Sequence, residues 1–165
     1  MTLNHARMFL ASLGSRRCSS FAPSQRLTLH GAQKAVSAAT AEAQSNGWAV
    51  SIAVVDAGGH PLCLHRLDAA APSSAGIASE KARTAAMFRK PTAVFEASVN
   101  IDADVVAMTQ IARTALLSSP YILMQGGVPI LLDGECVGAV GVSGVQSPQD
   151  EQVALAGAAA LGGCD

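Results

Sequence analysis

The spacing of apolar residues in the first half of the chain predicts one helix followed by two strands. Over residues 28–46 apolar side chains recur every three or four positions, which predicts a helix capped by Thr28 and stopped by Gly47. The run WAVSIAVV (48–55) is rich in β-branched residues, so we expect a strand buried on both faces. The glycines of DAGGH then predict a tight turn into a strand over 61–68.

Strand 61–68 is expected to alternate strictly, with successive side chains on opposite sides of the sheet. Leu62, Leu64 and Arg66 should then share one side of the sheet, and the other side should carry Cys63, His65 and Leu67. After this strand the apolar period returns to that of a helix. Residues 73–89 predict a helix that ends before Pro91, and Pro91 opens a shorter helix through TAVFEASVN.

The last third of the chain predicts another helix, a second hairpin and a final helix. The acid-rich start of DADVVAMTQIARTALL (102–117) predicts an amphipathic helix. Asp133-Gly134 lies between two apolar runs in 126–144, and an Asp-Gly pair in that setting is a strong hairpin signal. The final helix covers 147–161, with Ser147 as its N-cap. Hairpins separated by helices predict an α+β fold with an antiparallel sheet of four strands flanked by helices.

Composition limits the class of protein and adds one expectation. The 165 residues are 50% hydrophobic and only 14% charged, enough for the core of one domain. A surface so poor in charge and rich in alanine favours self-association, so we expect a homo-oligomer. The net charge of −1 gives no support for nucleic acid or an anionic membrane as a partner. No apolar run approaches the roughly 20 residues that a membrane helix needs.

Residues 1–25 differ from the rest and form a basic extension rich in serine and arginine, ahead of a domain over 26–165. They contain Arg7, Arg16 and Arg17, several apolar residues at helical spacing, and no acid. This composition is typical of a mitochondrial presequence. The alternative is a disordered extension or a start codon placed too early, in which case the protein would be cytoplasmic.

Several kinds of site receive no support from the sequence. The cysteines Cys18, Cys63, Cys136 and Cys164 are scattered without zinc or disulfide spacing, which favours free thiols. The glycine-rich stretches DAGGH, QGGVP and VGAVGVSG have neither the spacing nor the βαβ setting of a nucleotide site. No serine or cysteine is placed with a histidine so as to indicate a nucleophile.

The candidate binding residues are two histidines and a short cationic stretch. His30 lies in the first turn of the first predicted helix, and His60 lies at the tip of the first hairpin. A neutral imidazole can ligate iron, but each of these histidines also fits an ordinary surface position. The stretch SEKART places Lys81, Arg83 and Thr84 on one helix. It is either a solvated face with a Glu80–Arg83 pair or a cationic patch that receives carboxylates.

Four blocks in the same order resemble the GlcG/HbpS family, which also supplies the C-terminal domain of PduO-type proteins. The blocks are WAVSIAVVDAGGHPLCLHRLD, SEKARTA, GGVPILLDGECVGAVGVSG and PQDEQVA, and the resemblance runs from about Leu27 to the end. It implies a profilin-like antiparallel sheet of five strands, assembled into hexamers or octamers. YILM (121–124) is the candidate for the fifth strand. The segment between Asn100 and Pro120 is a less typical match.

The resemblance also implies a ligand, because relatives bind haem, act as haem or redox sensors, or accompany cobalamin enzymes. His30 matches the place of an axial histidine near the first helix. His60 falls in the GGH block, and Lys81, Arg83 and Thr84 fall in the KART block. We therefore expect a cofactor site made of these five residues.

The first hypothesis is a non-catalytic protein that binds haem, in preference to cobalamin, beside the first helix or between subunits. His30 would ligate the iron, and Lys81 and Arg83 would pair with the propionates. The alternative is an accessory protein or small enzyme for a hydroxy or oxo acid such as glycolate. Arg83 or Lys81 would then anchor the carboxylate while His60 or Asp56 moved a proton. A purely structural oligomer is the third hypothesis.

Overall fold

A computed structural model of the chain describes residues 20, 24–99 and 121–162. The helix expected over 102–117 lies outside the described residues, and so does nearly all of the predicted presequence. The described elements are α2 (Leu29–Ser45), β1 (Ser51–Asp56), β2 (Pro61–Arg66), α3 (Pro72–Phe88), α4 (Thr92–Val99), β3 (Gly127–Leu132), β4 (Glu135–Ser143) and α6 (Ser147–Ala159). None of the helices in these described ranges is long and apolar enough to cross a bilayer.

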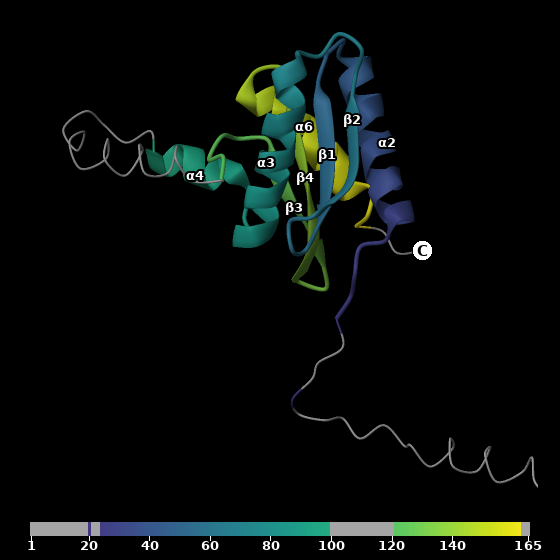
Figure 1. Cartoon of the computed structure of the whole chain (residues 1–165), viewed down its shortest axis with the longest axis vertical. Helices are drawn as coiled ribbons and strands as arrows, with labels where there is room; N and C mark the ends of the chain where they lie inside the picture. Colours follow the sequence, from purple (N-terminus) through teal and green to yellow (C-terminus); the bar gives the residue numbers. More distant parts are fainter. Residues whose placement is uncertain (1–19, 21–23, 100–120, 163–165) are drawn as a thin grey trace, which may run out of the picture.

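The four strands form one antiparallel sheet in the order β2-β1-β4-β3, with helices on both faces. Helices α2 and α6 cover one face and α3 covers the other (Figure 1). This architecture confirms the expected α+β fold. The suggested fifth strand at 121–124 is wrong, because that segment is not extended strand and pairs with none of the four strands in the described residues. The backbone N–H of Ile122 donates instead to the Thr84 hydroxyl on α3.

Strand β1 lies inside the sheet and sends alternate side chains into two separate cores. Ile52 and Val54 pack toward α2 and α6, whereas Ala53 and Val55 pack toward α3. The prediction of a strand buried on both faces is therefore confirmed, although pairing begins at Ser51 rather than at 48. The α3 layer is lined largely by alanines. A Cβ added at Gly141 of β4 would lie 2.1 Å from a carbonyl oxygen of α3, so helix and sheet are in backbone contact.

The two outer strands, β2 and β3, are both irregular. Each carries a proline, Pro61 or Pro129, and each pairing contains a register shift. The irregularity in β2 turns Leu62 toward the same core as Cys63. The strict alternation expected for this strand is therefore wrong at Leu62, because a bulge inserts one residue and changes which side the next one faces.

The turns and caps follow the sequence closely. Asp133 and Gly134 have φ values of 51° and 82°, the left-handed conformation that a two-residue hairpin turn needs. Thr28 caps α2 as expected, since its hydroxyl accepts from the Gly31 N–H. The predicted cap of α6 is wrong by one residue. Gln146 takes that position in place of Ser147, and its N–H donates to the Gln149 side chain.

Candidate functional site

The five predicted site residues do not all lie on the same face of the sheet. His30 is exposed in the first turn of α2, on the face that α2 and α6 cover. Lys81, Arg83 and Thr84 belong to α3, on the opposite face. A single chain therefore does not bring His30 together with the cationic residues of α3.

Lys81 is an interior residue rather than part of a surface patch. It is only 1% exposed, and its Nζ lies 2.8 Å from Oδ2 of Asp150, which is also buried. Burial raises the pKa of Asp150 against the opposing effect of Lys81. Within this chain the ammonium is committed to Asp150 and is not presented to an outside carboxylate.

The structure explains why two glycines, Gly126 and Gly127, stand in QGGVP: both pack against Lys81. A Cβ at Gly126 would lie 2.9 Å from the Lys81 Nζ, and a Cβ at Gly127 would lie 2.4 Å from the Lys81 carbonyl oxygen. Both glycines are therefore needed for the close approach of α3 to the start of β3.

Thr84 is also buried, and its hydroxyl has two partners. It donates to the Glu80 carbonyl at 2.7 Å and accepts from the Ile122 N–H at 3.0 Å. The side chain therefore fixes the segment that enters β3. It is a positioning residue of the α3 face rather than a surface donor.

Arg83 is the α3 cation that remains available. Its guanidinium carbon lies 6.0 Å from the centroid of the Tyr121 ring, within the range of a cation–π contact. The Glu80–Arg83 pair considered from the sequence is not formed; one carboxylate oxygen of Glu80 is instead buried without a hydrogen bond. The Tyr121 ring in turn packs edge-on against Phe88, which packs against Phe95, each at a centroid distance of 5.1 Å.

The turn that carries His60 lies against Arg83. Gly59 has a φ of 77°, and a Cβ there would be 2.9 Å from Cγ of Arg83 and 3.6 Å from Sδ of Met87. The adjacent His60 side chain is 80% exposed, with its Nδ1 3.3 Å from Oδ1 of Asp56. The two glycines make the turn, and they leave the imidazole near the end of α3.

Asp56 organises this turn. Its Oδ1 accepts the N–H groups of Gly58 and His60, both at 2.9 Å. Burial alone would raise the pKa of Asp56, but these hydrogen bonds outweigh it and hold the pKa below its usual value. Asp56 is therefore a carboxylate at neutral pH, able to orient the His60 ring but not to donate a proton.

These residues form one surface, which we call the cationic–aromatic surface and define as His60, Arg83, Met87, Phe88 and Tyr121. Met87 and Phe88 are each 46% exposed although both are large and apolar. The sequence prediction missed Met87, Phe88 and Tyr121. The chain has only four phenylalanines and one tyrosine, and three of these residues, Phe88, Phe95 and Tyr121, meet at this helix end in the fold. No local pattern in the sequence indicates that Tyr121 packs against α3.

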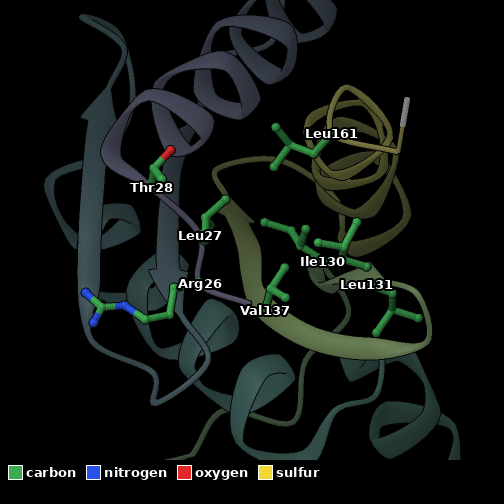
Figure 2. Close-up of a pocket in the computed structure, with 8 residues that line it drawn as sticks. Arg26, Leu27, Thr28, Ile130, Leu131, Val137 and Leu161 are labelled. Atoms are coloured by element: carbon green, nitrogen blue, oxygen red, sulfur yellow. The ribbon is translucent and has the colours of Figure 1, made fainter. Parts of the chain in front are cut away.

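A cavity of about 160 Å³ lies near His30, between the start of α2, the β3–β4 hairpin and the end of α6. Leu27, Ile130 and Leu161 project toward it, whereas the Arg26 side chain points away (Figure 2). Drug-sized ligands usually occupy about 300–1,000 Å³. This cavity is therefore too small to enclose a tetrapyrrole, and its lining does not include His30.

A family model and individual relatives both match most of this chain. Residues 27–159 match the family model described as haem degrading protein HbpS-like. Protein GlcG of Escherichia coli K12 is 47% identical over 109 residues, which are 66% of this chain and 74% of that protein.

Solved structures agree with the sequence matches. A double mutant of HbpS from Streptomyces reticuli has a TM-score of 0.72 at 35% identity, covering 90% of this chain and 96% of that one. A complex of PduOC with haem has a TM-score of 0.71 at 26% identity, covering 82% of this chain and 95% of that one.

Proposed function

The chain belongs to the HbpS-like family, and on that premise we propose that it is a homo-oligomeric, non-catalytic binding protein for haem or a related tetrapyrrole. The family description names haem, and one structural relative was solved with haem bound. The observation on this chain that carries the proposal is the cationic–aromatic surface, which includes the exposed imidazole of His60.

The chemistry of that surface suits a flat apolar ring that bears two carboxylates. Exposed Phe88 and Met87 offer an apolar bed, and Arg83 offers a guanidinium that can pair with a propionate. When bound, haem would supply an iron centre that takes an axial imidazole. His30 remains our proposed axial ligand, with His60 as a further contact. Thr84 acts indirectly by holding Ile122, the residue that follows Tyr121, and Lys81 has no direct part.

A hemin titration tests the proposal. The wild-type protein should shift the Soret band with one hemin per chain, and His30→Ala should lose the shift that is due to axial ligation. His65→Ala is the matched control, since His65 is also exposed but lies on the outer strand β2. A wild-type protein without a Soret shift would exclude haem binding. A shift that survives in His30→Ala but disappears in His60→Ala would move the ligand to the hairpin.

The same complex tests the absence of catalysis. With a reductant and oxygen present, the Soret band of a binding protein should persist for as long as that of a haem-binding control protein. Its loss, together with the appearance of a linear tetrapyrrole spectrum, would show that this chain degrades haem.

One feature favours a second candidate, a small hydroxy or oxo acid. The turn that holds the Asp56–His60 contact packs against the aliphatic part of Arg83, so a carboxylate bound by Arg83 would be near an imidazole able to move a proton. Glycolate or glyoxylate should then raise the melting temperature of wild-type protein but not of Arg83→Gln. Stabilisation by hemin alone would favour the first proposal.

A further inference from the structure

A row of three polar residues crosses the sheet next to the first turn of α3. In the register of the sheet, Ser51 of β1 lies between Arg66 of β2 and Ser143 of β4. Residues that pair across antiparallel strands send their side chains to the same face of the sheet. The Ser51 hydroxyl lies 2.8 Å from the hydroxyl of Ser74 in α3, so this face is the one that α3 covers. Arg66 and Ser143 therefore flank the place where α3 begins.

Ser143 contributes a hydroxyl that the described part of the chain leaves without a partner. The residue is only 7% exposed, and its hydroxyl forms no hydrogen bond with any described residue. The neighbouring hydroxyls differ, because Ser51 bonds to Ser74, which donates in turn to the Ala71 carbonyl at 2.6 Å. A nearly buried hydroxyl without a partner is unfavourable, so this position favours a ligand that accepts a hydrogen bond.

The first turn of α3 adds a backbone donor and a partial positive charge. Ala71 occupies the N-cap position without a side-chain hydrogen bond, Pro72 opens the helix, and no acid lies in the first turn. Proline has no N–H, and the N–H of Ser73 that follows it has no capping side chain. The beginning of a helix carries a partial positive charge, and its free N–H groups bind anions.

Arg66 supplies a full positive charge beside this helix end. It is exposed at the end of β2, and neither ion pair found among the described residues involves it. Asp68, exposed on the connection to α3, is the nearest acid along the chain, and it forms no ion pair with Arg66 either. A guanidinium presents several N–H donors to an oxyanion. Arg66 is therefore available to pair with an anion at the beginning of α3.

We propose that the beginning of α3 is a binding site for a phosphate group. The Ser143 hydroxyl and the Ser73 N–H donate to phosphate oxygens, and Arg66 pairs with the negative charge. These donors come from two strands and a helix, so a tetrahedral group with oxygens in several directions suits them better than a planar carboxylate. A helix of 17 residues is about 25 Å long, which separates this site from the cationic–aromatic surface at the other end of α3. The proposal is therefore independent of haem binding.

Thermal unfolding in inorganic phosphate tests the site. At constant ionic strength, phosphate should raise the melting temperature of the wild-type protein in a saturable way relative to chloride. Arg66→Ala and Ser143→Ala should each need about tenfold more phosphate for the same shift, because each loses a hydrogen bond to a charged group. Arg66 is exposed, so its variant should fold even if Ser143→Ala does not.

Two matched controls remove the same kinds of side chain elsewhere. Lys34→Ala removes an exposed cation from α2, on the other face of the sheet. Ser79→Ala removes an α3 hydroxyl that already donates to the Ala75 carbonyl at 2.9 Å. Both variants should respond to phosphate as the wild type does. A wild-type protein that phosphate does not stabilise would overturn the site. Equal responses of Arg66→Ala and Lys34→Ala would also overturn it, because they would indicate a general salt effect.

Two further comparisons test the kind of anion and its position. Acetate at the same concentration should raise the melting temperature less than phosphate does, and equal shifts would contradict the assignment to a phosphate group. Arg83→Ala, which alters the cationic–aromatic surface, should respond to phosphate as the wild type does. A weaker response of this variant would place the anion at that surface and overturn the site at the beginning of α3.

Discussion

A single buried charge, Lys81, shows where residue type misleads. As part of SEKART it suggested a surface patch, yet its side chain is buried and pairs with Asp150 of α6. The sequence contains a usable signal, because Lys81 falls on the face of the helix that carries Ala78, Ala82 and Ala85, all fully buried. A charged residue on such a stripe needs a buried partner, but a sequence alone does not reveal which acid supplies it.

The pair predicts an unequal response to single and double substitution. Lys81→Met or Asp150→Asn should each lower the free energy of unfolding by roughly 3–5 kcal/mol, because each leaves a buried polar group or charge without its partner. The double variant Lys81→Met/Asp150→Asn should lose much less than the sum of the two. Urea denaturation of all four proteins measures this difference, and additive losses would show that the two side chains are independent.

Among the elements, turns and helices were predictable to within a few residues because their signals are local. The Asp133-Gly134 turn depends only on the left-handed conformations of its two residues. Helix α2 depends on its Thr28 cap and on apolar residues spaced along one side of the helix. The outer strand β2 was less predictable. Its bulge arises from pairing with β1, a contact that no short window of sequence contains.

Two glycines in open space make a matched test of local conformation. Neither Gly134 nor Gly76 has an atom within 4 Å of an added Cβ, but Gly134 has a φ of 82° in a turn, whereas Gly76 lies within α3. Gly134→Ala should cost about 1–2 kcal/mol of stability through backbone strain. Gly76→Ala should add about 0.5–1 kcal/mol, because alanine favours a helix. Changes of the same sign in thermal unfolding would contradict this assignment.

At the scale of the whole molecule, the sequence predicted the order of elements but not which of them share a face. His30 and Arg83 both belong to correctly predicted helices, yet the sheet separates those helices. That arrangement depends on how the connections cross the sheet, which periodicity does not encode. That the five site residues bind a ligand stays a prediction. The presequence hypothesis for residues 1–25 also stays a prediction, and the relatives named above are bacterial proteins.

The proposed domain boundary near residue 26 can be tested by truncation. Residues 24–26 are exposed, and Leu27 is the first described residue that packs against the core. A chain that begins at residue 24 should keep the melting temperature of the full chain. A chain that begins at residue 29 loses both Leu27 and the Thr28 cap and should lose about 2 kcal/mol. A large loss in the longer truncated chain would place the boundary earlier.

The prolines of β2 and β3, together with the bulge of β2, have a consequence for the protein at high concentration. A proline withdraws a donor from the open border of a sheet, and a bulge breaks the regular row of groups that an added strand would need. Because both outer strands carry a proline and β2 also carries a bulge, the native fold is a poor template for cross-β growth. Concentrated native protein should therefore resist seeding into amyloid fibrils.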